Sequence, residues 1–99
     1  VLWADSLSEE AVDRLWLGLA RDKESLFYSA SALRQGMDQF NELLAKICRE
    51  QSIEFIDLTP MSGNIDYFYD DCHFTEVGAS EVAHRISTYM LSDPVRLQE

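Results

Sequence analysis

The sequence predicts an α/β fold in which three helices accompany one short strand. Three observations indicate this class. Apolar residues recur at helical spacing in three separate segments, and a nearly continuous apolar run occupies residues 53–58. Only a short connection separates that run from the helix before it. A short apolar run that follows a helix so closely is typical of a buried parallel strand.

The first helix is expected at about residues 8–20, where apolar side chains recur at helical spacing (Val12, Leu15, Trp16 and Leu19). Two N-terminal signals are present: Ser6 with Glu9 as a capping box, or Ser8 as the N-cap. Trp3 and Trp16 are expected to pack in the core, since aromatic side chains bury large apolar areas. A place in the wall of a substrate entrance is the alternative for both.

The second helix is expected at about residues 31–50, with an apolar stripe formed by Leu33, Met37, Phe40, Leu44 and Ile47. Gly36 in its interior costs about 1 kcal/mol relative to Ala, or marks close packing. The strand then covers 53–58, and Asp57 in it is expected to hydrogen-bond the following loop. One strand cannot form a parallel sheet, so we expect it to pair with strands outside these residues.

The loop at 59–74 is rich in turn residues and leads to the last helix, expected at about 76–92. Thr75 is a suitable N-cap for this helix, and Glu76 complements its dipole. Gly78 leaves room where helix and loop approach closely. The apolar stripe of the helix is expected to pack inward (Ala79, Val82, Ala83, Ile86 and Met90).

Asp70 lies three residues before His73 in this loop. A carboxylate at that spacing on a tight turn can accept a hydrogen bond from Nδ1–H of the imidazole, and the ring then acts as a base through its other nitrogen. We therefore predict that His73 is a general base and acid and that Asp70 orients it. Asp71 is the alternative orienting acid.

The segment DDCHFTEVGASEVAHRI, which begins at Asp70, resembles the last conserved block of the SGNH/GDSL hydrolases. Asp70 and His73 match the family's catalytic Asp and His, and Gly78 matches the glycine that opens the helix. The segments QFNELLAKICREQSIEFIDL and VLWADSLSEEAVDRLWLGL are similar to the parts that precede this block. The resemblance implies that residues 1–99 form the C-terminal part of a flavodoxin-like, three-layer α/β/α domain.

The same resemblance implies a serine ester hydrolase of the esterase, lipase or deacetylase type, with no cofactor. Its substrate would be an ester of a small molecule or an acylated sugar. The family's nucleophilic Ser lies in an N-terminal Gly-Asp-Ser block that these residues lack, and Ser62-Gly63-Asn64 follows no strand–helix turn of that kind. We therefore expect the nucleophile to lie outside this chain and the 99 residues alone to be inactive.

Charge and composition argue against two classes of partner. The formal net charge is −10, and the chain has no cluster of basic residues, so nucleic-acid backbones and anionic membrane surfaces are not expected partners. No apolar run is long enough to span a bilayer. These features leave the compartment unassigned.

The cysteines and the metal-binding potential of the loop leave further alternatives. Asp70, Asp71, Cys72 and His73 could each bind a metal, but we expect neighbouring side chains to point apart, and no metal is predicted. For the same reason Cys72 is not expected to act as a nucleophile with His73. Cys48 is expected to be a buried apolar residue, and a Cys48–Cys72 disulfide is left open.

The alternative function is a non-catalytic acidic module that self-associates through its apolar helix faces.

Overall fold

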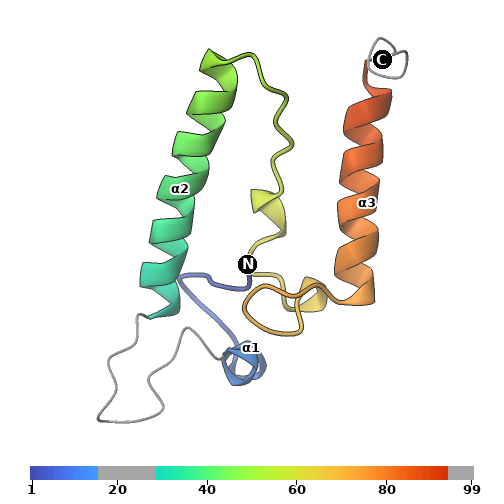
Figure 1. Cartoon of the computed structure of the whole chain (residues 1–99). Coiled ribbons are helices and arrows are strands. Elements are labelled where there is room, and N and C mark those ends of the chain that lie inside the picture. Colours follow the sequence, from blue (N-terminus) through green and yellow to red (C-terminus); the bar gives the residue numbers. More distant parts are fainter. Residues whose placement is uncertain (16–28, 94–99) are drawn as a thin grey trace.

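The computed structural model describes residues 1–15 and 29–93, and this part of the chain is mainly helical (Figure 1). It contains three α-helices and two short 3₁₀ helices: α1 (Glu9–Arg14), α2 (Ala30–Glu50), η1 (Thr59–Met61), η2 (Ile65–Tyr67) and α3 (Glu76–Leu91). None of the described helices combines the length and the hydropathy needed to cross a membrane.

The predicted α/β class is wrong for the described residues, which contain no strand and no sheet. The predicted strand at 53–58 has no regular secondary structure and runs between α2 and α3 (Figure 1). An apolar run becomes a strand only when a neighbouring strand binds its N–H and C=O groups. Among the described residues, β pairing is limited to one isolated antiparallel bridge between Phe68 and Phe74.

Helix α1 begins where its capping chemistry predicts. The Ser8 side chain accepts a hydrogen bond from the Ala11 amide at 3.2 Å, so Ser8 rather than Ser6 is the N-cap. The helix ends at Arg14, because Leu15 adopts an extended backbone. The prediction of a helix over 8–20 was therefore too long at its C-terminal end up to Leu15, and residues 16–20 lie outside the described part.

A small apolar core joins α1 to the N-terminal segment and to the loop before α3. Its buried members are Leu2, Trp3, Ala11, Leu15 and Phe68, and side chains such as Leu33 and Met37 from the first turns of α2 pack against them. Trp3 is 8% exposed, which agrees with a core position. The core thus lies at the end of the molecule where the predicted site loop is anchored.

Hydrogen bonds from two arginines fasten the backbone around this core. The Arg14 guanidinium donates to the carbonyls of Ile65 at 2.8 Å and Phe68 at 2.9 Å. The Arg34 guanidinium donates to the Trp3 carbonyl at 3.2 Å. Because each arginine bridges elements far apart in sequence, the two hold α1, α2 and the loop in one arrangement.

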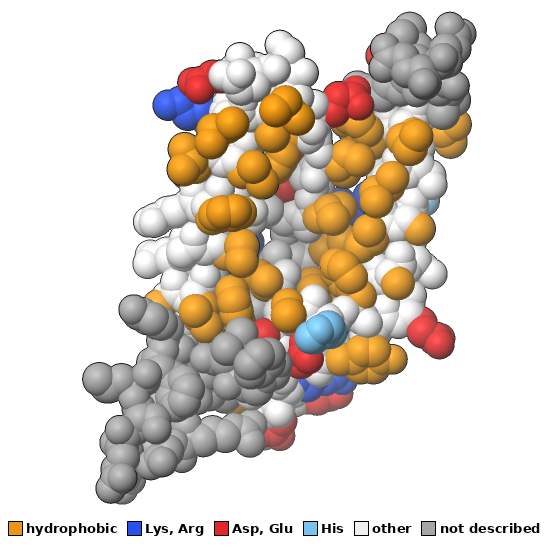
Figure 2. Space-filling view, in the orientation of Figure 1, with side chains coloured by type: hydrophobic (Ala, Val, Ile, Leu, Met, Phe, Trp, Pro, Cys, Tyr) orange, Lys and Arg blue, Asp and Glu red, His pale blue; other side chains and the backbone are white. Residues whose placement is uncertain are grey.

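The upper turns of α2 and most of α3 carry apolar side chains that remain exposed. Figure 2 shows apolar surface gathered over both helices, and the exposed fraction is 61% for Phe40, 58% for Leu43 and 42% for Met90. The expectation that the α3 stripe packs inward was wrong. The two helices extend from the core on either side of segment 53–58 (Figure 1). The Cα radius of gyration is 16.2 Å, against about 13 Å for a compact domain of this length.

The start of α3 is fixed against η2 by one threonine and one glycine. The Thr75 side chain accepts from the Gly78 amide at 3.0 Å and donates to the Asp66 carbonyl at 2.5 Å. A Cβ at Gly78 would overlap the Tyr67 carbonyl. Gly78 therefore allows the helix to approach the loop, as the sequence predicts. Gly36 has open space around it, so it does not mark close packing.

Alanine at the two helical glycines is expected to change stability in opposite directions. Gly78→Ala should lower the free energy of unfolding by about 1–3 kcal/mol, because the added methyl forces helix and loop apart. Gly36→Ala should raise it by about 0.5–1 kcal/mol through backbone entropy alone. Urea unfolding followed by far-UV circular dichroism measures both. Equal shifts of the same sign would contradict the packing described for Gly78.

Candidate functional site

The loop that carries Asp70 and His73 is closed at its base. The Tyr69 amide donates to the His73 carbonyl at 2.9 Å, and just outside this contact Phe68 pairs with Phe74 through the isolated bridge. The rings of Phe68 and Phe74 lie 5.3 Å apart between centroids. Since Phe68 is a core residue, the loop projects from a fixed base.

The Asp70 carboxylate organises the tip of this loop. Its Oδ1 accepts hydrogen bonds from the backbone amides of Cys72 at 3.0 Å and His73 at 2.8 Å, which is the local turn that aspartate favours. Its Oδ2 lies 2.9 Å from Nδ1 of His73. The predicted contact between Asp70 and the His73 ring is therefore present, and the same carboxylate holds the backbone beneath the ring.

These hydrogen bonds keep Asp70 ionised. Partial burial opposes the charge, but donation from the amides of Cys72 and His73 and from the His73 ring outweighs it and lowers the pKa of Asp70 to about 2. An ionised carboxylate at this position requires a proton on Nδ1 for the contact with the ring. Asp70 thus selects the tautomer of His73 whose Nε2 is free to accept a proton.

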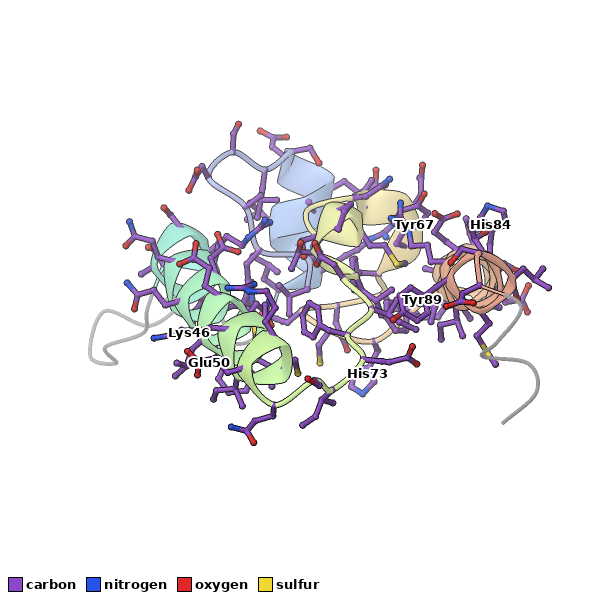
Figure 3. All side chains as sticks on the ribbon, turned by 90° about the horizontal axis from the view of Figure 1, so that it is seen from above. Lys46, Glu50, Tyr67, His73, His84 and Tyr89 are labelled. Carbon is purple, nitrogen blue, oxygen red and sulfur yellow. The ribbon has the colours of Figure 1, made fainter. Side chains whose placement is uncertain are left out.

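The His73 ring is accessible from outside. Its side chain is 71% exposed, whereas that of Asp70 is 26% exposed. Seen from above, His73 lies at the edge of the molecule between α2 and α3 and points outward (Figure 3). With Nδ1 held by Asp70, Nε2 is the nitrogen available to a reacting group.

Asp71 is not the orienting acid, because it is fully buried and the His73 ring contacts Asp70 instead. Its Oδ2 accepts from Nε1 of Trp3 at 2.6 Å, and its carbonyl accepts from the Leu2 amide at 2.8 Å. This anchoring role of Asp71 is not predicted from the sequence. The partners are 68 residues apart, and no local pattern links them.

Cys72 lies next to the ring, contrary to the expectation that neighbouring side chains point apart. Its Sγ is 3.9 Å from Nδ1 of His73. One ligand atom from each of Asp70, Cys72 and His73 can be chosen so that all three lie within 4.8 Å of one another. Cys48 is buried and Cys72 is exposed, and both are free thiols, so the disulfide left open by the sequence does not form.

Three other sequence features lie away from this loop tip or serve the backbone. Gly63 occupies a turn with φ +78°, and Asn64 caps η2 by accepting from the Asp66 amide, which fits a structural turn rather than a catalytic block. Asp57 accepts from the amide and hydroxyl of Thr59 at 2.9 and 2.6 Å, as expected. His84 lies on a different side of α3 from His73 (Figure 3).

Comparison with known proteins adds no assignment. The chain matches no family model, no curated protein and no solved structure. The resemblance to the SGNH/GDSL hydrolases therefore stays a prediction, and the geometry of Asp70 and His73 has to support any functional proposal.

The depressed pKa of Asp70 predicts how stability depends on pH. Since the pKa in the folded protein, about 2, lies below the ordinary value of about 3.9, ionised Asp70 stabilises the fold. This contribution is complete above about pH 5 and is lost progressively as the pH falls through about 2. Asp70→Asn should therefore destabilise the protein at pH 6 and have a smaller effect at pH 2 in urea unfolding.

A direct titration checks the same point. The ¹³C shift of the Asp70 carboxyl should titrate with a midpoint near 2, and His73→Ala should raise that midpoint only part of the way, because the two amide donors remain. A midpoint near the ordinary value of about 4 in the unaltered protein would contradict the hydrogen bonding described here.

Proposed function

We propose that this chain supplies the acid–base half of a serine ester hydrolase site, with His73 as general base and acid and Asp70 as its orienting carboxylate. The observation that carries the proposal is the 2.9 Å contact between Asp70 Oδ2 and His73 Nδ1 on a ring whose side chain is 71% exposed. A fixed carboxylate, a fixed tautomer and an accessible second nitrogen are what base catalysis by histidine requires.

The nucleophile in this proposal is a serine hydroxyl from a segment outside these 99 residues. His73 Nε2 takes the hydroxyl proton as the oxygen attacks the ester carbonyl, and Asp70 stabilises the resulting imidazolium. The imidazolium returns the proton to the leaving alcohol as the C–O bond breaks. Water then repeats the sequence on the acyl-enzyme, which releases the acid and regenerates serine. Donors to the oxyanion come from outside the chain as well.

The surroundings of His73 suit an ester with some apolar surface. Tyr69 and Phe74 flank the Asp70–His73 turn in the chain, and they are 63% and 40% exposed. Aromatic faces of this kind can contact an acyl chain or a sugar ring. These exposed rings are compatible with the substrate that the family resemblance implies, an ester of a small molecule or an acylated sugar.

Single substitutions at His73, Asp70 and His84 test the proposal. They are made in a protein that joins this chain to the segment with the serine. His73→Ala should lower kcat on a chromogenic acetate ester by at least about 10²-fold, the usual contribution of a positioned acid–base group. Asp70→Asn should also lower kcat, because it removes the carboxylate that selects the tautomer. His84→Ala is the matched control, since His84 lies on a different side of α3 (Figure 3), and should leave activity unchanged.

Two outcomes would overturn the assignment. Full activity in the His73→Ala variant would remove the proposed base. Turnover by the 99-residue chain alone that is lost with His73→Ala would show that the nucleophile lies within it. Labelling with a fluorophosphonate followed by peptide mapping identifies the reactive serine, and the labelling rate should fall in the His73→Ala variant.

A second candidate function is self-association, which the exposed apolar side chains of α2 and α3 favour. Four of them are more than half exposed: Phe40 and Leu43 on α2, and Val77 and Leu91 on α3. Surface of this kind beside a polar rim is typical of a protein interface. A second copy of the chain would cover these faces without any catalytic role.

Sedimentation velocity over a range of concentrations tests self-association. The unaltered chain should form dimers, and Leu43→Glu should shift it to the 11.4 kDa monomer by placing a charge in the apolar contact. Gln35→Glu adds the same charge at an exposed position of α2 off the apolar stripe and should leave the dimer intact. A monomer at every concentration, or equal effects of both changes, would contradict this role.

A further inference from the structure

We propose that Asp70, Cys72 and His73 form a binding site for one Zn²⁺ ion at the tip of the loop before α3. From the sequence, no metal is predicted here, because side chains of neighbouring residues are expected to point apart. The fold reverses that premise. Hydrogen bonds from the amides of Cys72 and His73 to Asp70 Oδ1 wrap the backbone around the carboxylate and turn both side chains toward it.

The spacing of the donor atoms is close to that of a tetrahedral zinc site. His73 Nδ1 lies 2.9 Å from Asp70 Oδ2 and 3.9 Å from Cys72 Sγ, and one ligand atom from each residue can be chosen with all three within 4.8 Å of one another. Zn–N, Zn–O and Zn–S bonds of usual length at tetrahedral angles place ligand atoms about 3.2–3.7 Å apart. The Cys72 and His73 side chains are exposed, so rotation about their side-chain bonds can adjust these separations.

The chemistry of the three donors selects the cation. A thiolate and an imidazole favour zinc over magnesium or calcium, and a single carboxylate completes a set that zinc accepts. Asp70 Oδ1 is held by two amides, so Oδ2 is oriented toward the ion by supporting hydrogen bonds of the kind that metal ligands require. Three protein ligands leave a fourth position for water, because the site opens to solvent.

Zinc and general-base catalysis would exclude each other, a consequence that rests on the function proposed above. Both use His73 Nδ1. With the metal on Nδ1, the neutral ring carries its proton on Nε2 and cannot accept one from a serine hydroxyl. Zinc would therefore act as an inhibitor of the site rather than as its cofactor.

Binding to the metal-free, reduced chain tests the site without any measurement of activity. Isothermal titration with ZnCl₂ should show one equivalent bound, and Co²⁺ in its place should give a thiolate-to-cobalt charge-transfer band. Cys72→Ser should abolish that band and weaken zinc binding by at least about tenfold, as should His73→Ala, since even the loss of a supporting group commonly costs this much. Cys48→Ser removes the buried thiol of α2 and His84→Ala removes the other imidazole, and both should bind as the unaltered chain does.

These results distinguish a specific zinc site from nonspecific binding of zinc to the protein surface. Unchanged affinity in Cys72→Ser, or equal losses in Cys72→Ser and Cys48→Ser, would overturn the proposal. The ¹⁵N shifts of the His73 ring with zinc bound report which nitrogen is the ligand. Nδ1 is expected, and ligation through Nε2 would overturn the exclusion of base catalysis. Failure of the hydrolase proposal would leave these binding results unaffected, because zinc binding and ester hydrolysis are measured independently.

Discussion

The buried hydrogen bond between Trp3 and Asp71 is the constraint on which the rest of the site depends. Nε1–H of Trp3 donates to Oδ2 of Asp71 at 2.6 Å and so joins the N-terminal segment to the loop. The bond lies beside a core that contains Leu2 and Phe68. Loss of a buried partner of this kind costs about 1–3 kcal/mol, a large fraction of the stability of a small domain. Because Asp71 is held inward, the loop tip presents Asp70 and His73 outward.

Two consecutive acids therefore have opposite tasks. Asp71 is fully buried and anchors the loop, whereas Asp70 binds two backbone amides and the His73 ring at the surface. The same Asp70 contacts that lower its pKa also bring Cys72 beside the ring. In the two proposals, one small turn would serve either as an oriented base or as a set of zinc ligands, and both uses need Nδ1 of His73.

The helices around this loop form an open arrangement rather than a closed core. The burial that supports the site is concentrated in the N-terminal segment, at α1 and in the loop after η2. Apolar side chains farther along α2 and α3 stay exposed (Figure 2). Exposed apolar area contributes nothing to folding until another surface covers it. This explains why self-association is a reasonable second role for the same chain.

Local sequence by itself predicted the N-cap at Thr75 and the contact between Asp70 and His73, because each depends on residues within four positions of one another. For α1 it left Ser6 and Ser8 open as the N-cap, and the structure decided for Ser8. Local sequence did not determine whether segment 53–58 is a strand, since a strand needs partners that this segment does not find among the described residues. Only the tertiary structure decided that Asp71 binds Trp3 and that apolar side chains on the outer turns of α2 and α3 remain exposed to solvent. Those outcomes depend on contacts between distant segments, which no local spacing encodes.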